Sequence, residues 1–202
     1  KNRHFCFVFI YIIKMNNIKI FDQDLPNDID LSDEKVIGLD CEALGLVLGR
    51  DPLTLVQLGL ESKKFFLIKL DRNNYNAPNL KKLLSNNKIQ FIMHYARQDL
   101  LWLQYHLGIK IENIFCTKLA SKIARTASSS HGYKDLVKEI CSKDISKKEQ
   151  QSDWGDPNLS DKQISYAAQD TEFLFEIKKK LENMLEREKR IELYKKSIKV
   201  LP

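Results

Sequence analysis

Residues 36–42, with the sequence VIGLDCE, form an apolar run that ends in two acidic residues. Val, Ile and Leu favour a β-strand, and a short apolar run of this kind is typical of a strand buried inside a sheet. Side chains two positions apart on a strand point to the same face, so Asp40 and Glu42 emerge side by side. Neighbouring carboxylates repel and raise each other's pKa unless a cation lies between them. The chain must therefore fold around a place where negative charge is neutralised.

Two further acids also interrupt apolar segments. Asp99 precedes the apolar residues 100–103, and Asp170 lies within an apolar helical stretch, where Tyr166 is its neighbour one turn earlier. One such acid alone is most often a helix cap or the edge of a solvated face. Four acids in three separate apolar elements favour a common site instead. Carboxylate oxygens are the ligands of hard cations such as Mg²⁺ or Mn²⁺, and two such ions about 3.5–4 Å apart serve in-line phosphodiester displacement.

The order of expected elements indicates the fold class. Strands come first and then alternate with helices, which favours an α/β fold with helices on both sides of a central mixed sheet of five strands. A single long amphipathic helix is expected to begin after the candidate N-cap Ser160 and to run through Leu185. No repeat or linker is evident, so residues 15–202 are expected to form one domain. Residues 1–14 are expected to be a non-native or upstream extension, because Met15 opens a polar segment.

Composition sets broader limits. With 33 Lys and Arg against 27 Asp and Glu, the net charge of +6 suits a polyanionic partner without identifying one. The four cysteines are widely spaced and form no C-x-x-C pair, which argues against a zinc site and predicts the reduced thiols of a cytoplasmic protein. The longest apolar run, residues 5–13, is too short to cross a bilayer, so no membrane partner is expected.

Three motifs in order carry a family resemblance. They are D-x-E (Asp40 and Glu42), H-x-x-x-x-D-L (from His94) and Y-x-x-x-D (Tyr166 and Asp170). This set resembles the tyrosine subclass of the DEDD superfamily of 3′→5′ exonucleases, and implies their ribonuclease H-like fold. Further segments resemble the short bacterial oligoribonucleases called nanoRNase C; these are DLPN (24–27), EALGL (42–46), RDPLTLVQL (50–58), APNL (77–80), FCTKLASKIART (115–126), HGYKDL (131–136) and QQSDW (150–154).

The resemblance implies hydrolysis assisted by two divalent cations, Mg²⁺ or Mn²⁺. Asp40 would bridge the two ions, Glu42 and Asp170 would complete the first site, and Asp99 would hold the second ion through water. Tyr166 would orient the attacking water. A phenol with a pKa of about 10 stays protonated at neutral pH, so it is better suited to orient water than to take its proton.

Five other residues are candidate substrate contacts: Leu44, His94, Gln98, His131 and Trp154. Each has a polar, aromatic or wedge-like side chain close in sequence to a motif or an irregular segment. Structural alternatives are open for three of them. Leu44 fits a turn residue packed on the core just as well as a substrate contact. His94 also fits a hydrogen-bonded structural histidine, and a core anchor is the commoner role of a tryptophan such as Trp154.

The leading hypothesis is a metal-dependent 3′→5′ exoribonuclease that degrades short single-stranded RNA, from dinucleotides upward. Ribonuclease D-like trimming of longer structured RNA and 3′→5′ hydrolysis of DNA share the chemistry and differ in how the substrate is held. An inactive nucleic-acid-binding module is the alternative from another class, against which all four carboxylates and the tyrosine argue. The nanoRNase C resemblance also implies a homo-oligomeric ring, whose contacts are expected to bury an apolar stripe of Leu181, Leu185, Ile191, Tyr194 and Ile198.

Overall fold

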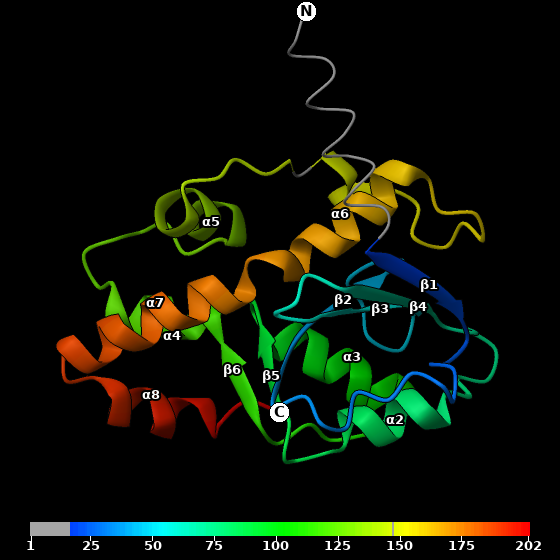
Figure 1. Ribbon diagram of the computed structural model, residues 1–202, viewed down its shortest axis with the longest axis horizontal. Coiled ribbons are helices and arrows are strands. Elements are labelled where there is room, and N and C mark those ends of the chain that lie inside the picture. Colours follow the sequence, from blue (N-terminus) through cyan, green and yellow to red (C-terminus); the bar gives the residue numbers. More distant parts are fainter. Residues whose placement is uncertain (1–16, 147) are drawn as a thin grey trace, which may run out of the picture.

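The computed structural model describes residues 17–146 and 148–202, so the extension expected at residues 1–14 lies outside the described residues. One mixed sheet crosses the molecule (Figure 1). Its central strands β2, β3 and β4 pair antiparallel, and its outer strands pair parallel with their neighbours. The strand order is β1 (Ile18–Asp22), β4 (Phe65–Lys69), β3 (Leu53–Gly59), β2 (Val36–Ala43), β5 (Gln90–Met93) and β6 (Ile114–Cys116). The predicted α/β fold with a mixed sheet is confirmed.

Within residues 17–146 and 148–202 the sheet has six strands, where five were expected. The two edge strands are short, with five residues in β1 and three in β6. β1 also pairs in parallel with β4, a partner more than forty residues further along the chain, in register from Ile18↔Phe65 to Asp22↔Lys69. Short edge strands with distant partners leave little periodicity in the local sequence, so the strand count was one too low.

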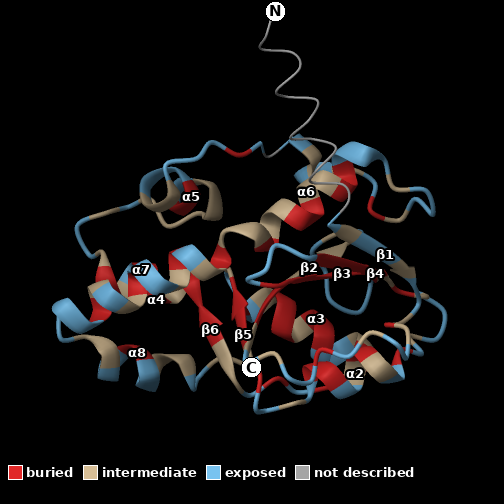
Figure 2. Cartoon of the chain, viewed as in Figure 1, coloured by how far each residue is buried: buried red, intermediate tan, exposed pale blue. Residues whose placement is uncertain are grey.

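Helices cover both faces of the sheet (Figures 1 and 2). α2 and α3 pack on one face over the largest buried cluster, whereas α6 and α7 cover the other. In the part of the chain that the structure describes, no helix is long and apolar enough to cross a membrane. The helices are α2 (Pro78–Leu84), α3 (Arg97–Leu107), α4 (Thr117–Ala124), α5 (Tyr133–Cys141), α6 (Asp161–Glu172), α7 (Leu174–Arg187) and α8 (Ile191–Ile198), with a 3-10 turn, η1, at Lys148–Gln151.

The long helix expected over residues 160–185 is two helices. Ser160 caps α6 as predicted, and its hydroxyl accepts the hydrogen bond of a backbone N–H in the first turn. α6 ends at Glu172, and Phe173, with φ −103° and ψ 0°, separates it from α7. The apolar periodicity continues across this point. The break involves contacts from elsewhere in the chain, including Lys63 Nζ, which donates to the Glu172 carbonyl at 2.6 Å.

The apolar stripe near the C-terminus is buried within this chain. Leu181 and Leu185 are fully buried and Tyr194 is 4% exposed, in a cluster shared with α4, α5 and β6. The Tyr194 hydroxyl accepts a hydrogen bond from the Cys116 N–H at 2.8 Å. The expectation that contacts between copies bury this stripe is therefore wrong for these three residues, because α8 folds back onto α4 and β6, and the two isoleucines of the stripe are half-buried against the same cluster.

Two glycines allow α6 to approach the sheet closely. A Cβ atom on Gly59 would lie 2.5 Å from Thr171 Oγ1, and one on Gly38 would lie 3.3 Å from the Thr171 carbonyl oxygen. Side chains at these strand positions would push the helix outward. The sequence of β2 and β3 thus fixes how near the last turn of α6 lies to the sheet.

Gly59→Ala is accordingly expected to lower the free energy of unfolding by about 1–3 kcal/mol, because α6 must shift to accommodate the new methyl group. Urea denaturation measures the loss. Combining Gly59→Ala with Thr171→Ala should recover part of it, since the second change removes the nearest atom. A Gly59→Ala protein as stable as the parent would contradict the close packing.

Candidate active site

The acid pair of β2 lies on the part of the strand that extends beyond its pairing with β5. The ladder between β2 and β5 ends at Gly38↔Ile92, ahead of Asp40, so β2 continues beyond its neighbour. Across the other edge, Asp40 pairs with Gln57 of β3. Asp40 and Glu42 lie on the face of the sheet that α6 covers, as the two-residue period of a strand predicts.

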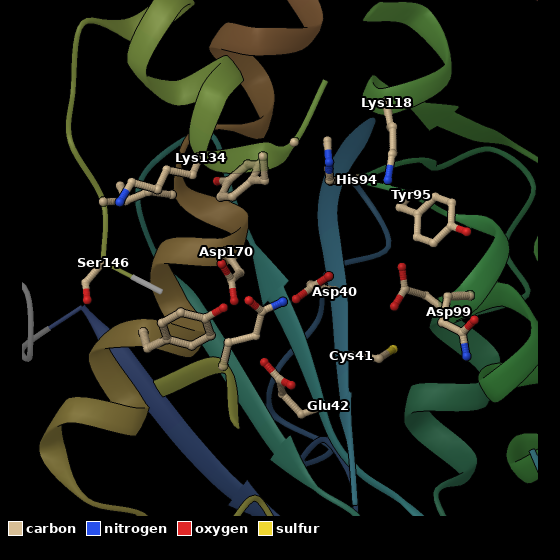
Figure 3. Close-up of a pocket in the computed structure, with 16 residues that line it drawn as sticks. Asp40, Cys41, Glu42, His94, Tyr95, Asp99, Lys118, Lys134, Ser146 and Asp170 are labelled. Atoms are coloured by element: carbon tan, nitrogen blue, oxygen red, sulfur yellow. The ribbon is translucent and has the colours of Figure 1, made fainter. Parts of the chain in front are cut away.

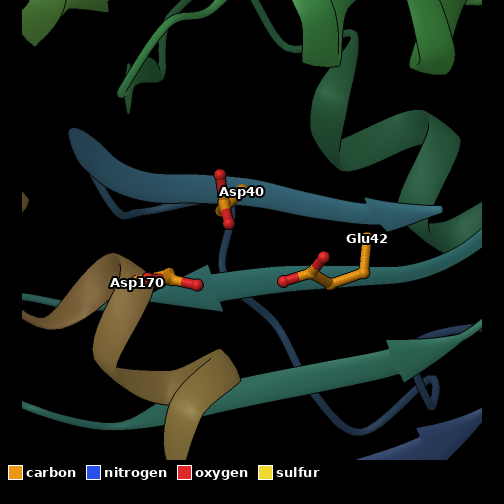
Figure 4. A group of neighbouring side chains, drawn as sticks. All are labelled: Asp40, Glu42 and Asp170. Carbon is orange, nitrogen blue, oxygen red and sulfur yellow. The ribbon is translucent and has the colours of Figure 1, made fainter. Parts of the chain in front are cut away.

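Three carboxylates converge at this place (Figure 4). One oxygen each from Asp40, Glu42 and Asp170 lies within 4.8 Å of the other two. Asp170 belongs to the last turn of α6, the turn that packs against the strand glycines. All three residues are half-buried. A set of hard oxygen donors at this spacing fits a divalent cation such as Mg²⁺ or Mn²⁺.

Asp99 faces the same pocket from the first turn of α3 (Figure 3). It is 7% exposed and lies outside the three-acid group. Its charge is nevertheless the strongest among the charged neighbours that raise the pKa of Asp40. The four acids predicted from three motifs therefore surround one pocket, with Asp99 set back from the other three.

Burial and mutual repulsion raise the pKa values of these acids. Burial is the larger cause for Asp40, followed by the charges of Asp99, Asp170 and Glu42. Burial, then Asp170 and Asp99, raises the pKa of Glu42 to about 9. The pKa of Asp99 is raised chiefly by burial. Among the described residues, the charged neighbours that raise the pKa of Asp40 are all acids, so the pocket concentrates negative charge that a divalent cation would neutralise.

A buried amide beside Asp40 supports the same fit. Gln57 is fully buried, and within the described residues neither its side-chain oxygen nor its nitrogen has a hydrogen-bond partner. Leaving a buried polar group unpaired costs about 1–3 kcal/mol, so native proteins do so rarely. The strand register places this unpaired group next to the acid cluster. A hydrated cation bound by the acids would place polar groups near this unpaired amide.

Tyr166 lies one turn before Asp170 on α6 and lines the same pocket. Burial is the main cause that raises the pKa of its phenol, followed by the charges of Asp170, Glu42 and Asp40. The hydroxyl therefore keeps its proton at neutral pH. The expected pairing of Tyr166 and Asp170 on one helical face is present.

The predicted substrate contacts divide into two groups. His94 and Gln98 line the acidic pocket, and His94 Nδ1 also lies 2.9 Å from Thr117 Oγ1. Leu44 and His131 lie outside the pocket lining. Leu44 is 39% exposed, and His131 Nδ1 lies 2.8 Å from the Ser121 hydroxyl.

Trp154 is a core residue. It is 4% exposed and packs with Leu55, Leu67 and Ile164, and its ring centroid lies 5.9 Å from that of Tyr166. Burying so large an apolar ring is strongly favourable, and the buried face is not open to a nucleobase. The expectation of a base-stacking surface is thus corrected to the alternative, a core anchor beneath the tyrosine.

Sequence reasoning missed much of the pocket wall. Tyr95 is 51% exposed at the rim, with a positive φ of 62°, and Lys118 Nζ lies 3.9 Å from its ring centroid. A positive φ is uncommon outside glycine, and such strain often occurs at functional sites. The only sequence signal was the position of Tyr95 inside the H-x-x-x-x-D motif. The other missed lining residues include Ser146 and Gln150.

The raised pKa values predict how stability depends on pH. Because the folded protein binds protons more tightly than the unfolded chain at Asp40, Glu42 and Asp99, the free energy of unfolding should fall as pH rises from about 5 to about 9. Metal-free protein should therefore melt at a lower temperature at pH 9 than at pH 6. Saturating Mg²⁺ should flatten this slope, because it binds the ionised carboxylates. Thermal melts across this pH range with EDTA or Mg²⁺ provide the check; a pH-independent melting temperature in EDTA would contradict it.

Comparisons with known proteins agree with this geometry. A family profile described as 3′-5′ exonuclease matches residues 17–186. Ribonuclease D of Xanthomonas oryzae pv. oryzae is 32% identical over 155 residues, which are 77% of this chain and 42% of that protein. The exosome complex component 10 homolog of Drosophila melanogaster is 34% identical over 132 residues, or 65% of this chain and 14% of that protein. This chain thus spans less than half the length of these curated relatives.

Solved structures show the same relationship. NrnC of Brucella melitensis has a TM-score of 0.88 at 37% identity, with 93% of this chain and 90% of that chain covered. Other structures of that protein contain Mg²⁺ or pGG. Ribonuclease D of Escherichia coli, with a TM-score of 0.73 at 22% identity and 84% and 44% coverage, shares the fold. Since the profile covers most of the chain and the motif residues meet in one pocket, the chain belongs to the 3′-5′ exonuclease family, in its ribonuclease D-like branch.

Proposed function

We propose that this chain hydrolyses short single-stranded oligoribonucleotides from their 3′ ends, down to dinucleotides, and releases nucleoside 5′-monophosphates. The observation that carries the proposal is the pocket of about 300 Å³ that four acids and Tyr166 share. A pocket of this size holds a small ligand such as the end of one strand. The similarity to NrnC over nearly the whole of both chains, including a structure of NrnC bound to pGG, supports a short substrate.

The residues present are suited to this chemistry. When bound, two divalent cations, Mg²⁺ or Mn²⁺, supply Lewis acidity toward the scissile phosphate. Asp40 would hold both ions, Glu42 and Asp170 the first, and Asp99 the second. Tyr166, whose pKa is raised, keeps its proton and orients the attacking water as a hydrogen-bonding group. The water oxygen bonds to phosphorus as the bond from phosphorus to the 3′ oxygen of the preceding nucleotide breaks. That 3′ oxygen takes up a proton in place of the one the water loses, and the terminal nucleotide leaves with its 5′-phosphate.

Other pocket residues would hold the substrate. Lys118 and Lys134 line the same pocket as the acids (Figure 3) and suit backbone phosphates. His94 and Gln98 are placed to contact the sugar or phosphate of the terminal nucleotide. Leu44, two residues beyond Glu42 and partly exposed, remains our candidate for a wedge against a base.

A length series tests the proposal. Purified protein is given labelled RNA and DNA oligonucleotides of 2 to 20 residues with Mg²⁺, Mn²⁺ or EDTA. We expect dinucleotides to be hydrolysed at least about tenfold faster than 20-mers, and EDTA to stop the reaction. Equal rates on the two lengths would favour ribonuclease D-like trimming, and faster cleavage of DNA would favour a DNA exonuclease. RNA binding that is insensitive to EDTA and releases no mononucleotide would identify an inactive binding module.

The homo-oligomeric ring and the cytoplasmic location stay predictions. Light scattering coupled to size-exclusion chromatography measures the subunit number directly. A monomer at micromolar concentration would contradict the first of these expectations.

A further inference from the structure

One side chain interrupts the backbone ladder between α6 and α7. The Tyr133 hydroxyl donates a hydrogen bond to the Gln169 carbonyl at 2.9 Å and accepts one from the Phe173 N–H at 3.2 Å. In a continuous α-helix these two backbone groups would bond to each other, because each N–H pairs with the carbonyl four residues earlier. The hydroxyl therefore occupies one step of the ladder. A side chain inserted in this way is an established cause of helix bends.

The interrupted turn is the one that carries Asp170. Asp170 lies directly after Gln169, and Tyr166 lies one turn earlier on the same helix. Tyr133 also lines the acidic pocket, and its ring centroid lies 5.6 Å from that of His94. After burial, the charge of Asp170 is the leading cause that raises the pKa of Tyr133. The inserted hydroxyl is thus next to the acid cluster as well as within the helical ladder.

We propose that Tyr133 is a positioning residue: its hydroxyl sets the bend after Glu172 and so aims Asp170 and Tyr166 at the acid pair of β2. Without the hydroxyl, the Gln169 carbonyl and the Phe173 N–H can bond directly, and the helix can run on through residue 173 as its apolar periodicity favours. The last turn of α6 would then tighten and turn Asp170. The proposal rests on the proposed function only for its kinetic readout.

The same contact joins the helix to the pocket wall. Tyr133 is the first residue of α5, and its neighbours Gly132 and Lys134 line the pocket. A substrate that contacts the start of α5 would therefore contact or displace Tyr133, whose hydroxyl bonds to the helical turn that carries Asp170. Tyr133 thereby couples a binding surface to the geometry of the acids.

Tyr133→Phe tests the proposal, because it keeps the ring and removes only the hydroxyl. We expect kcat on a dinucleotide to fall about 10- to 100-fold, since small misplacements of reacting groups have effects of this size, while KM stays within about twofold. The rise in melting temperature on adding Mn²⁺ should shrink by about half, because the acids bind the ion less well. The melting temperature without metal should change little, since the Gln169 carbonyl and the Phe173 N–H can then hydrogen-bond to each other.

Tyr75→Phe is the matched control. Its hydroxyl also donates to a backbone carbonyl, that of Leu53 at 3.1 Å, and Tyr75 does not line the acidic pocket. This variant should keep the parent's kcat and its Mn²⁺-induced shift. A Tyr133→Phe protein with an unchanged kcat and an unchanged Mn²⁺-induced shift would overturn the proposal, whether or not its metal-free stability falls. The Mn²⁺ shift needs no substrate, so it tests Tyr133 even if the length series refutes the short-RNA function.

Discussion

Asp40→Asn is expected to abolish turnover and at the same time to raise the melting temperature of the metal-free protein. Asp40 is the acid on which the charges of Asp99, Asp170 and Glu42 all act, and it is the proposed shared ligand of both cations. Losing that ligand removes several kcal/mol of transition-state stabilisation, or about 10³-fold or more in kcat. Removing its charge also relieves repulsion in a buried cluster. Each kcal/mol so gained raises the melting temperature by about 2–4 °C.

Activity on a dinucleotide and thermal melts in EDTA measure the two effects. Asp33→Asn is the matched control, since Asp33 is an exposed acid away from the pocket and should leave both values unchanged. Residual activity within tenfold of the parent would remove Asp40 from the catalytic machinery. A lower metal-free melting temperature would show that the carboxylate is not under repulsion.

Tyr166→Phe should lower kcat by about 10²-fold or more while KM stays within about twofold, because the role proposed for the hydroxyl is to orient the water and not to bind the substrate. The ring would keep its packing on Trp154, so the melting temperature should change little. Single-turnover hydrolysis of a labelled dinucleotide gives the chemical rate.

Tyr105→Phe, at a tyrosine that is 58% exposed and outside the pocket, provides the control. An unchanged kcat in Tyr166→Phe would refute the water-orienting role. Comparison with Tyr133→Phe separates the two tyrosines. Both variants should lower kcat, but only the change at Tyr133 should weaken the Mn²⁺-induced rise in melting temperature.

The parts of the site that could be predicted from the sequence are those encoded at short range. Asp40 and Glu42 share a face because strand side chains alternate, and Tyr166 and Asp170 share one because helical neighbours are four residues apart. The shared chemistry of four acids in apolar segments favoured a common site with Asp99, and the family resemblance assigned the acids their roles in it. Nothing in the local periodicity of three distant segments states that they converge.

What could not be predicted depends on contacts between distant residues. The apolar pattern of residues 160–185 continues through Phe173. It therefore gives no sign of the helix break at that residue, where the Tyr133 hydroxyl bonds to the backbone. Trp154 has a flat aromatic ring of the kind that stacks on nucleobases, but the ring is buried under Tyr166. The C-terminal stripe looked uncovered because its partners in α4 and β6 lie some 70 residues earlier.

The acids of the pocket come from β2, α3 and the end of α6, and the first and the last lie 130 positions apart in the sequence. Asp170 can therefore join the others only after the ribosome has made every segment from β2 to the end of α6. Until then, a nascent chain holds only part of the acid cluster. The order of segments along the chain therefore keeps the pocket incomplete until α6 has been synthesised.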